Sequence, residues 1–269
     1  MKFRIGFADK ESHKTEKECL ELVQRTDAPR KSVVQVYFPG RNMILAYYND
    51  RFDPQPGDLV YVDGKLEGKR GRVVEVNYNF KIKLSDYKRV IALVDTSVSG
   101  EFFAAGSHYV TFDPQTLSAS KVRGWFKAPD TDEEYVSGSD DTSFRLEHLI
   151  DMNVTAAIVE RGHEYYIENK VRYLCVDGMK GYAVVEGTEP YELEFTYRDG
   201  EISNLTCSCF CSYNCKHEVA AMLQMKETLE LISEQYAKRN EESGYFAAVY
   251  KGTLFEYAID GKKTGSFVL

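Results

Sequence analysis

The stretch Cys207-Ser-Cys209-Phe-Cys211-Ser-Tyr-Asn-Cys215-Lys-His217 places four cysteines and a histidine within eleven residues. Thiolates and an imidazole at this density are suited to closing a tetrahedral zinc site. The residues that follow, Glu218 to Leu223, predict a helix that begins where the stretch ends. One half of the predicted site therefore lies on a loop and the other half at the start of a helix.

The cluster offers five candidate ligands for four positions. We assign the ligands to Cys207, Cys209, Cys215 and His217. Small Ser208 allows the sharp turn that Cys207 and Cys209 need to converge, and the helix start favours thiolate over thiol at Cys215. Cys211 remains as a spare thiol or as a group that supports the four ligands from outside the metal site. The alternatives are a redox switch in which Cys211 exchanges disulfides and a set of reduced residues with no common role.

Length and composition indicate a folded protein outside the membrane. The chain has 269 residues, 43% of them hydrophobic, which is enough for two modest domains. No apolar run approaches the roughly 18 residues of a membrane span, and the first residues lack the core of a secretory signal. We expect a cytoplasmic protein, in which clustered cysteines favour a metal over disulfides. The isolated Cys19 and Cys175 are interpreted as buried core thiols.

The N-terminal half predicts a small β-barrel. Residues 57–76 read GDLVYVDGKLEGKRGRVVEV, with short valine-rich runs between glycines. Short strands joined by tight glycine turns are typical of a strongly bent barrel. The segment resembles a KOW-type motif, which is common in small barrels that contact RNA, ribosomes or RNA polymerase. Another barrel or a sandwich is the alternative. Further strands are expected at Lys2–Ala8, Ser32–Phe38, Met43–Tyr48, Val90–Val94, His108–Phe112 and around Gly124–Phe126, and a helix at Thr15–Arg25.

Basic residues concentrate in the same half. Residues 1–100 hold 18 Lys and Arg against 14 Asp and Glu, whereas residues 101–269 hold 16 against 28. Basic side chains with aromatic residues between them suit a nucleic-acid groove, where phosphates meet cations and bases stack on rings. The alternative is an ordinary solvated face. The candidate nucleic-acid-binding residues are Lys65, Lys69, Arg70, Arg72, Lys81, Lys83, Lys88 and Arg89.

The second half mixes helices and strands. Its expected strands are Lys170–Val176, Tyr182–Val185, Tyr191–Tyr197 and Ile202–Thr206, the last of which delivers Cys207. Its expected helices are Phe144–Ile150, Thr155–Arg161 and His217 to about Lys238, the last with a core stripe of Met222, Met225, Leu229 and Ile232. A closing hairpin is predicted from Tyr245–Tyr250 and Leu254–Ile259.

The pattern Cys207-Ser-Cys209, a short loop and Cys215-Lys-His217 resembles a SWIM zinc finger, whose signature is C-x-C, a variable loop and C-x-H. Upstream, the segments 161–166 and 183–187 with Val171 and Tyr191 resemble the strand-rich lead-in of SWIM regions in bacterial proteins associated with Swi/Snf-type helicases. The resemblance covers about residues 159–225. The extra Cys211 in a short loop departs from the family pattern. The family is found in helicase-like ATPases, transposases and ubiquitin ligases, and the resemblance implies DNA binding or protein–protein contact.

These features define the expected organisation. The fold class is α+β, mostly β, with a small N-terminal β-barrel domain followed by an α+β zinc-finger domain. The expected boundaries are a β-rich domain at 1–128, an acidic linker at 129–143, the SWIM-type domain at 144–240 and a C-terminal hairpin at 241–269.

The sequence shows no motif for catalysis. Gly68–Gly71 and Gly261–Gly265 lack the frame of a phosphate-binding loop, and no nucleophile elbow occurs. We therefore expect no enzymatic activity and no small-molecule substrate. The expected function is that of a Zn²⁺-binding accessory protein that binds DNA or RNA. The alternative is an adaptor whose acidic half docks a protein such as a Swi/Snf-type ATPase.

Overall fold

The computed structural model describes residues 4–6, 29–129, 138, 142–209, 211, 213–260 and 266–268. The fold is α+β and mostly β, as predicted, and its strands form antiparallel sheets. The expected helix at Thr15–Arg25 and most of the acidic stretch lie outside the described residues. No helix in the described part of the chain has the length and apolar character needed to cross a membrane.

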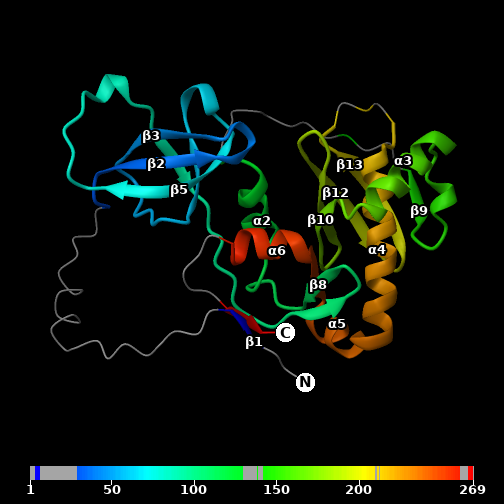
Figure 1. The fold of residues 1–269 in the computed structure, drawn as a ribbon. Helices are drawn as coiled ribbons and strands as arrows, with labels where there is room; N and C mark the ends of the chain where they lie inside the picture. Colours follow the sequence, from blue (N-terminus) through cyan, green and yellow to red (C-terminus); the bar gives the residue numbers. More distant parts are fainter. Residues whose placement is uncertain are drawn as a thin grey trace.

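The N-terminal half forms a five-stranded sheet in the order β3-β2-β5-β4-β6 (Figure 1). The strands are β2 (Ser32–Phe38), β3 (Met43–Asn49), β4 (Leu59–Val62), β5 (Arg70–Asn77) and β6 (Val90–Leu93). The predicted closed barrel is not found. The edge strands approach each other, but only one parallel bridge, Tyr48 to Arg89, joins their ends. A single bridge is not a hydrogen-bonded ladder, so the sheet stays open.

A larger, eight-stranded sheet carries the second half and runs in the order β7-β8-β14-β10-β11-β12-β13-β9. Its strands are β7 (Phe103–Ala105), β8 (His108–Thr111), β9 (Ser143–Arg145), β10 (Val171–Asp177), β11 (Lys180–Glu186), β12 (Pro190–Arg198), β13 (Glu201–Cys207) and β14 (Tyr245–Tyr250). Strands from both sides of the acidic stretch meet in this sheet, so the expected boundary at 129–143 does not separate two sheets. A third, two-stranded sheet pairs β1 (Arg4–Gly6) with β15 (Ser266–Val268).

Helices cover both faces of the eight-stranded sheet. On one face lie α3 (Ala156–Ile167) and α4 (Lys216–Gln235), which continues into α5 (Ala237–Ser243). On the other face lie α2 (Ala119–Phe126) and α6 (Lys251–Ala258) (Figure 1). Successive side chains along a strand point to opposite faces of the sheet, so each central strand contributes to the hydrophobic core on both faces. In β11, Tyr182 and Val184 pack toward α2 and α6, whereas Ala183 and Val185 pack toward α4.

Three expected elements differ from the structure. Leu254–Ile259 is not the second strand of a hairpin, because most of it belongs to α6. Gly124–Phe126 is the end of α2, a helix whose N-cap Ser118 accepts a hydrogen bond from the Lys121 amide. Phe144–Ile150 is not an α-helix but comprises parts of β9 and of the 3-10 helix η4 (Leu149–Asp151).

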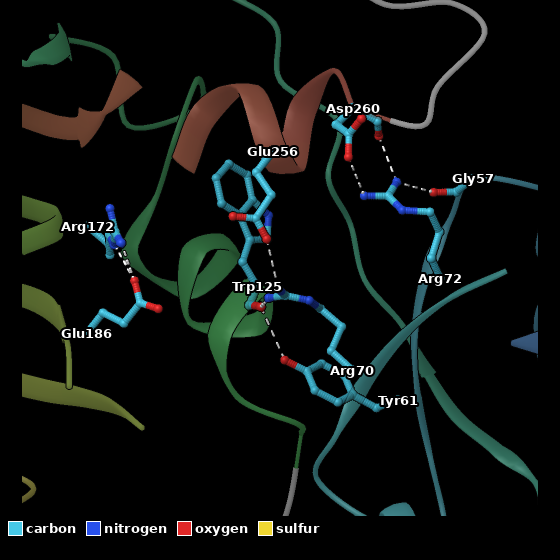
Figure 2. A network of polar contacts seen from close by, with 9 residues as sticks. All are labelled: Gly57, Tyr61, Arg70, Arg72, Trp125, Arg172, Glu186, Glu256 and Asp260. Carbon is cyan, nitrogen blue, oxygen red and sulfur yellow. Dashed lines mark hydrogen bonds and ion pairs between the residues drawn. The ribbon is translucent and has the colours of Figure 1, made fainter. Parts of the chain in front are cut away.

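The two halves are joined by a polar network, shown in Figure 2. The guanidinium of Arg70 donates to the carbonyl oxygen of Trp125 and to the carboxylate of Glu256, and it stacks over the ring of Tyr257. Arg72 donates to the backbone carbonyl and the carboxylate of Asp260. Leu59 and Tyr61 of β4 continue the contact into the apolar core beside α2 and α6.

Candidate metal centre

The four predicted ligands lie at the end of β13, in the loop that follows it and at the start of α4. Strand β13 ends at Cys207, and Cys215 is the N-cap residue of α4, two positions before His217. Ser208 fixes the turn to Cys209, because its amide donates to the Glu192 carbonyl and its hydroxyl accepts from the Glu192 amide, both at 2.9 Å. The serine therefore extends the pairing with β12 by one residue.

The ligand atoms of this cluster converge. One atom from each of Cys207, Cys209, Cys215 and His217 lies within 4.8 Å of every other. His217 Nδ1 is 3.7 Å from Cys207 Sγ and 3.6 Å from Cys215 Sγ. Cys215 and His217 are buried, and the other two are half-buried. The cluster can therefore hold a metal ion, and its soft donors fit a thiolate-binding metal.

A buried carboxylate fixes the helix start. Glu218, only 5% exposed, accepts a hydrogen bond from the Cys215 amide at 2.6 Å and completes a capping box with the Cys215 side chain. Burial, together with the nearby negative charge of Cys215, raises the pKa of Glu218 to about 8. Cys215 is thus oriented by a side chain three positions further along the chain.

The pKa values of the Cys207 and Cys215 thiols depend on one another. The hydrogen bond from the Cys207 thiol, followed by that of His217, lowers the pKa of Cys215. The same bond and burial raise the pKa of Cys207. These shifts favour the thiolate at Cys215 over Cys207, and metal binding would release thiol protons.

Aromatic rings enclose the imidazole of His217. The Tyr191 ring stacks on it with centroids 4.2 Å apart and planes 21° apart, and the Tyr165 ring meets it edge-on at 5.5 Å. His217 is 4% exposed, and its Nε2 has no hydrogen-bond partner among the described residues. The strand pattern predicts the position of Tyr191 on a strand. It does not predict the contact with His217, because 26 residues separate the two.

The remaining cysteines do not join the cluster in the described structure. Cys211 is exposed. Cys175 is buried in the apolar core, as predicted, and burial raises its thiol pKa to about 11. Cys19 lies outside the described residues.

The eight basic residues divide into two groups. The three arginines are half-buried, and each makes an ion pair: Arg70 with Glu256, Arg72 with Asp260, and Arg89 with Asp50. The five lysines are exposed and form no ion pair within the described part of the chain: Lys65, Lys69, Lys81, Lys83 and Lys88. The arginines therefore serve internal contacts, and the lysines remain available to a ligand.

One further cation was not predicted from the sequence. The guanidinium of exposed Arg30 stacks 4.1 Å over the ring of Tyr78, near the start of the loop that carries Lys81 and Lys83. Its neighbour in sequence, Lys31, is also exposed. The sequence does show the basic pair Arg30-Lys31. Nothing in the neighbouring residues indicates that Arg30 lies against Tyr78.

Comparison with known proteins found no matching family model, no matching curated protein and no matching solved structure. A function for this chain must therefore be argued from its own residues.

Proposed function

We propose that the chain binds one Zn²⁺ ion through Cys207, Cys209, Cys215 and His217, and that this ion is structural. With zinc–sulfur bonds of about 2.3 Å and zinc–nitrogen bonds of about 2.0–2.1 Å, a tetrahedral ion holds sulfur and nitrogen about 3.6 Å apart. The distances of 3.6 and 3.7 Å from His217 Nδ1 to two sulfurs match this spacing. Three thiolates and one imidazole complete the coordination, which leaves no position for water and supports a non-catalytic, SWIM-type role.

Zinc in this position would join the end of β13 to the start of α4. Helix α4 packs across the sheet through Val219, Met222 and Met225, all buried. An ion bound to Cys207 and Cys215 would therefore fix the first turn of this core helix against the sheet edge. Metal binding of this kind contributes directly to folding free energy.

The proposed ligand of the zinc-loaded protein is nucleic acid, DNA or RNA, bound along the N-terminal sheet. The exposure of all five predicted lysines is the observation that carries this proposal. The side chain of Lys88 packs over Gly64, the residue that precedes Lys65. Tyr78 and Tyr87 are half-buried within the same segment, and Arg30 stacks on Tyr78. Lysines would contact phosphates and the aromatic rings would stack with bases.

Fluorescence anisotropy across a salt series tests this proposal on duplex DNA, single-stranded DNA and RNA. The variant Lys81→Glu/Lys83→Glu/Lys88→Glu should weaken binding at least about tenfold and flatten the salt dependence, because each lost phosphate contact reduces the slope. Lys238→Glu on α5 is the control for a single Lys→Glu charge reversal on a different, exposed element. Equal binding by the wild type and the triple variant would exclude this face.

A second candidate, a protein adaptor, is favoured by the outer face of α3. Val159 and Ile167 are 43% and 61% exposed, and exposed His163 lies between them at helical spacing. Carboxylates border this strip, with Glu160 and Glu164 on α3 and Glu227 and Glu230 on α4 beside Tyr166. An apolar strip with acidic borders fits a basic amphipathic helix. Such a helix could belong to a helicase-like ATPase.

Titration with a synthetic basic amphipathic peptide tests the adaptor role. Micromolar binding to the wild type that Val159→Ser/Ile167→Ser weakens at least about tenfold would support it, since these side chains are the apolar anchors. The control Met179→Ser removes a 56% exposed apolar side chain outside α3. Equal peptide binding by the α3 variant and the wild type would exclude the α3 face.

A further inference from the structure

The orientation of His217 is set by packing. A metal-bound imidazole is usually oriented by a hydrogen bond from its other ring nitrogen to a carboxylate, a carbonyl or water. In this chain Nδ1 faces Cys207 and Cys215, whereas Nε2 is buried without a partner among the described residues. Among the described residues, contacts other than a hydrogen bond to Nε2 therefore hold the ring.

The turn between β11 and β12 supplies that restraint. Gly187 N donates to the Glu189 carbonyl at 2.9 Å and closes this turn. A Cβ on Gly187 would lie 2.8 Å from the Tyr191 ring and 3.3 Å from His217 Nε2. The backbone of Gly187 does not have a positive φ, so space rather than conformation requires glycine at this position.

Tyr191 covers the face of the imidazole and is itself anchored. Its ring lies nearly parallel to that of His217, and its hydroxyl is 2.9 Å from the Thr188 hydroxyl of the same turn. The ring of Tyr165 closes the imidazole from another direction. Rotation of the His217 ring would collide with these groups, because a packed interior leaves little room for side-chain movement.

We propose that Gly187 and Tyr191 are positioning residues of the metal centre, which select Nδ1 of His217 as the ligand atom. The inference rests on the proposed zinc site. Gly187 leaves the space that the Nε2 edge of the ring occupies, and Tyr191 holds the plane of the ring in line with the sulfurs. The protein thus fixes the ligand by stacking and close approach where other sites use a hydrogen bond.

Long-range ¹H–¹⁵N NMR of the zinc-loaded full chain tests the choice of ligand atom. We expect His217 to show a metal-bound Nδ1 and a protonated Nε2. A metal-bound Nε2 would overturn the proposal and leave the zinc site intact. A wild-type chain that binds no zinc would overturn both the zinc site and the proposal that rests on it.

Zinc affinity, measured by competition with a chromophoric chelator, tests the two positioning residues. Gly187→Ala and Tyr191→Leu should each weaken zinc binding about 10–100-fold, the range seen when groups that orient a metal ligand are lost. Tyr191→Phe should stay within about threefold of the wild type because it keeps the stacked ring. The matched control is Gly40→Ala, which adds a Cβ with nothing within 4 Å.

The Co²⁺-loaded proteins add a readout of the coordination geometry. Gly187→Ala and Tyr191→Leu should shift the visible ligand-field bands, whereas Tyr191→Phe and Gly40→Ala should match the wild type. Wild-type affinity and spectrum in both Gly187→Ala and Tyr191→Leu would overturn the positioning role while leaving zinc binding established. Because Tyr191→Leu changes a half-buried side chain on a strand, it provides this test even where Gly187→Ala fails to fold.

Discussion

Arg70 donates a hydrogen bond to the backbone carbonyl of Trp125, 55 residues further along the chain. The same carbonyl accepts from the Tyr61 hydroxyl at 3.3 Å (Figure 2). One carbonyl oxygen at the end of α2 thus accepts hydrogen bonds from two side chains of the N-terminal sheet. Arg70 belongs to the junction between the two halves, where its guanidinium contacts Trp125, Glu256 and Tyr257.

Replacing Arg70 should therefore affect stability more than nucleic-acid binding. We expect Arg70→Ala to lower the free energy of unfolding by about 2–3 kcal/mol, because it removes a charged hydrogen bond to a carbonyl and the stacking on Tyr257. Lys69→Ala, at an exposed neighbour, should change it by less than about 0.5 kcal/mol. Urea denaturation measures both, and equal stability of the two variants would show that the Arg70 contacts contribute little.

Two glycines in helices should respond in opposite directions to alanine. A Cβ on Gly162 of α3 would lie 2.5 Å from Val219 of α4, whereas a Cβ on Gly124 of α2 would meet nothing within 4 Å. Gly162→Ala should cost about 1–3 kcal/mol through overpacking. Gly124→Ala should stabilise by about 0.5–1 kcal/mol through helix propensity. Thermal or urea unfolding measures both, and a stabilising Gly162→Ala would mean that α3 and α4 can separate at no cost.

The assignment of ligands within the cluster can be tested by a pair of cysteine variants. Cys215→Ser should lose zinc, since it removes both a ligand and the thiolate at the helix start. Cys211→Ser should keep about one zinc per chain. Metal analysis after dialysis gives both ratios. Loss of zinc from Cys211→Ser would mean that Cys211 replaces one of the four assigned ligands.

Acid should weaken the fold partly through His108. This histidine is fully buried, its Nε2 is 2.9 Å from the Val171 carbonyl, and burial lowers its pKa to about 4. Its unfolded pKa is about 6.5, so the unfolded chain binds the proton first and stability falls as the pH drops from about 6.5 to 4. The full loss from this group is on the order of 3 kcal/mol.

Comparison with His108→Gln isolates this contribution, because release of any metal bound at the cluster would affect both proteins alike. The free energy of unfolding, measured in urea at pH 7 and pH 5, should fall less in the variant than in the wild type. An equal fall in both would show that His108 does not titrate between the two states.

The sequence predicted those features that depend on neighbouring residues. The strands of the second half follow from alternating apolar residues, and the metal cluster follows from ligand spacing within eleven residues. In α6 the helical signal was also present, because the buried Leu254, Tyr257 and Ala258 have i, i+3 and i+4 spacing. The prediction of a closing hairpin was wrong here because it did not use this spacing.

Features that depend on distant partners could not be predicted. The basic run around Arg70 and Arg72 gives no sign that its arginines are paired, because Glu256 and Asp260 are 186 and 188 residues away. The contact between Gly187, Tyr191 and His217 depends on the register between β11 and β12 and on where α4 begins. Local sequence patterns predict neither this register nor the residue at which α4 begins.

The place of β14 sets the order in which the chain can assemble during synthesis. This strand pairs with β8 on one side and β10 on the other, so the eight-stranded sheet has no continuous ladder without it. The residues of β14 leave the ribosome after those of the metal cluster. If the cluster binds its metal as soon as it is synthesised, it does so before β14 joins β8 to β10 in the middle of the sheet.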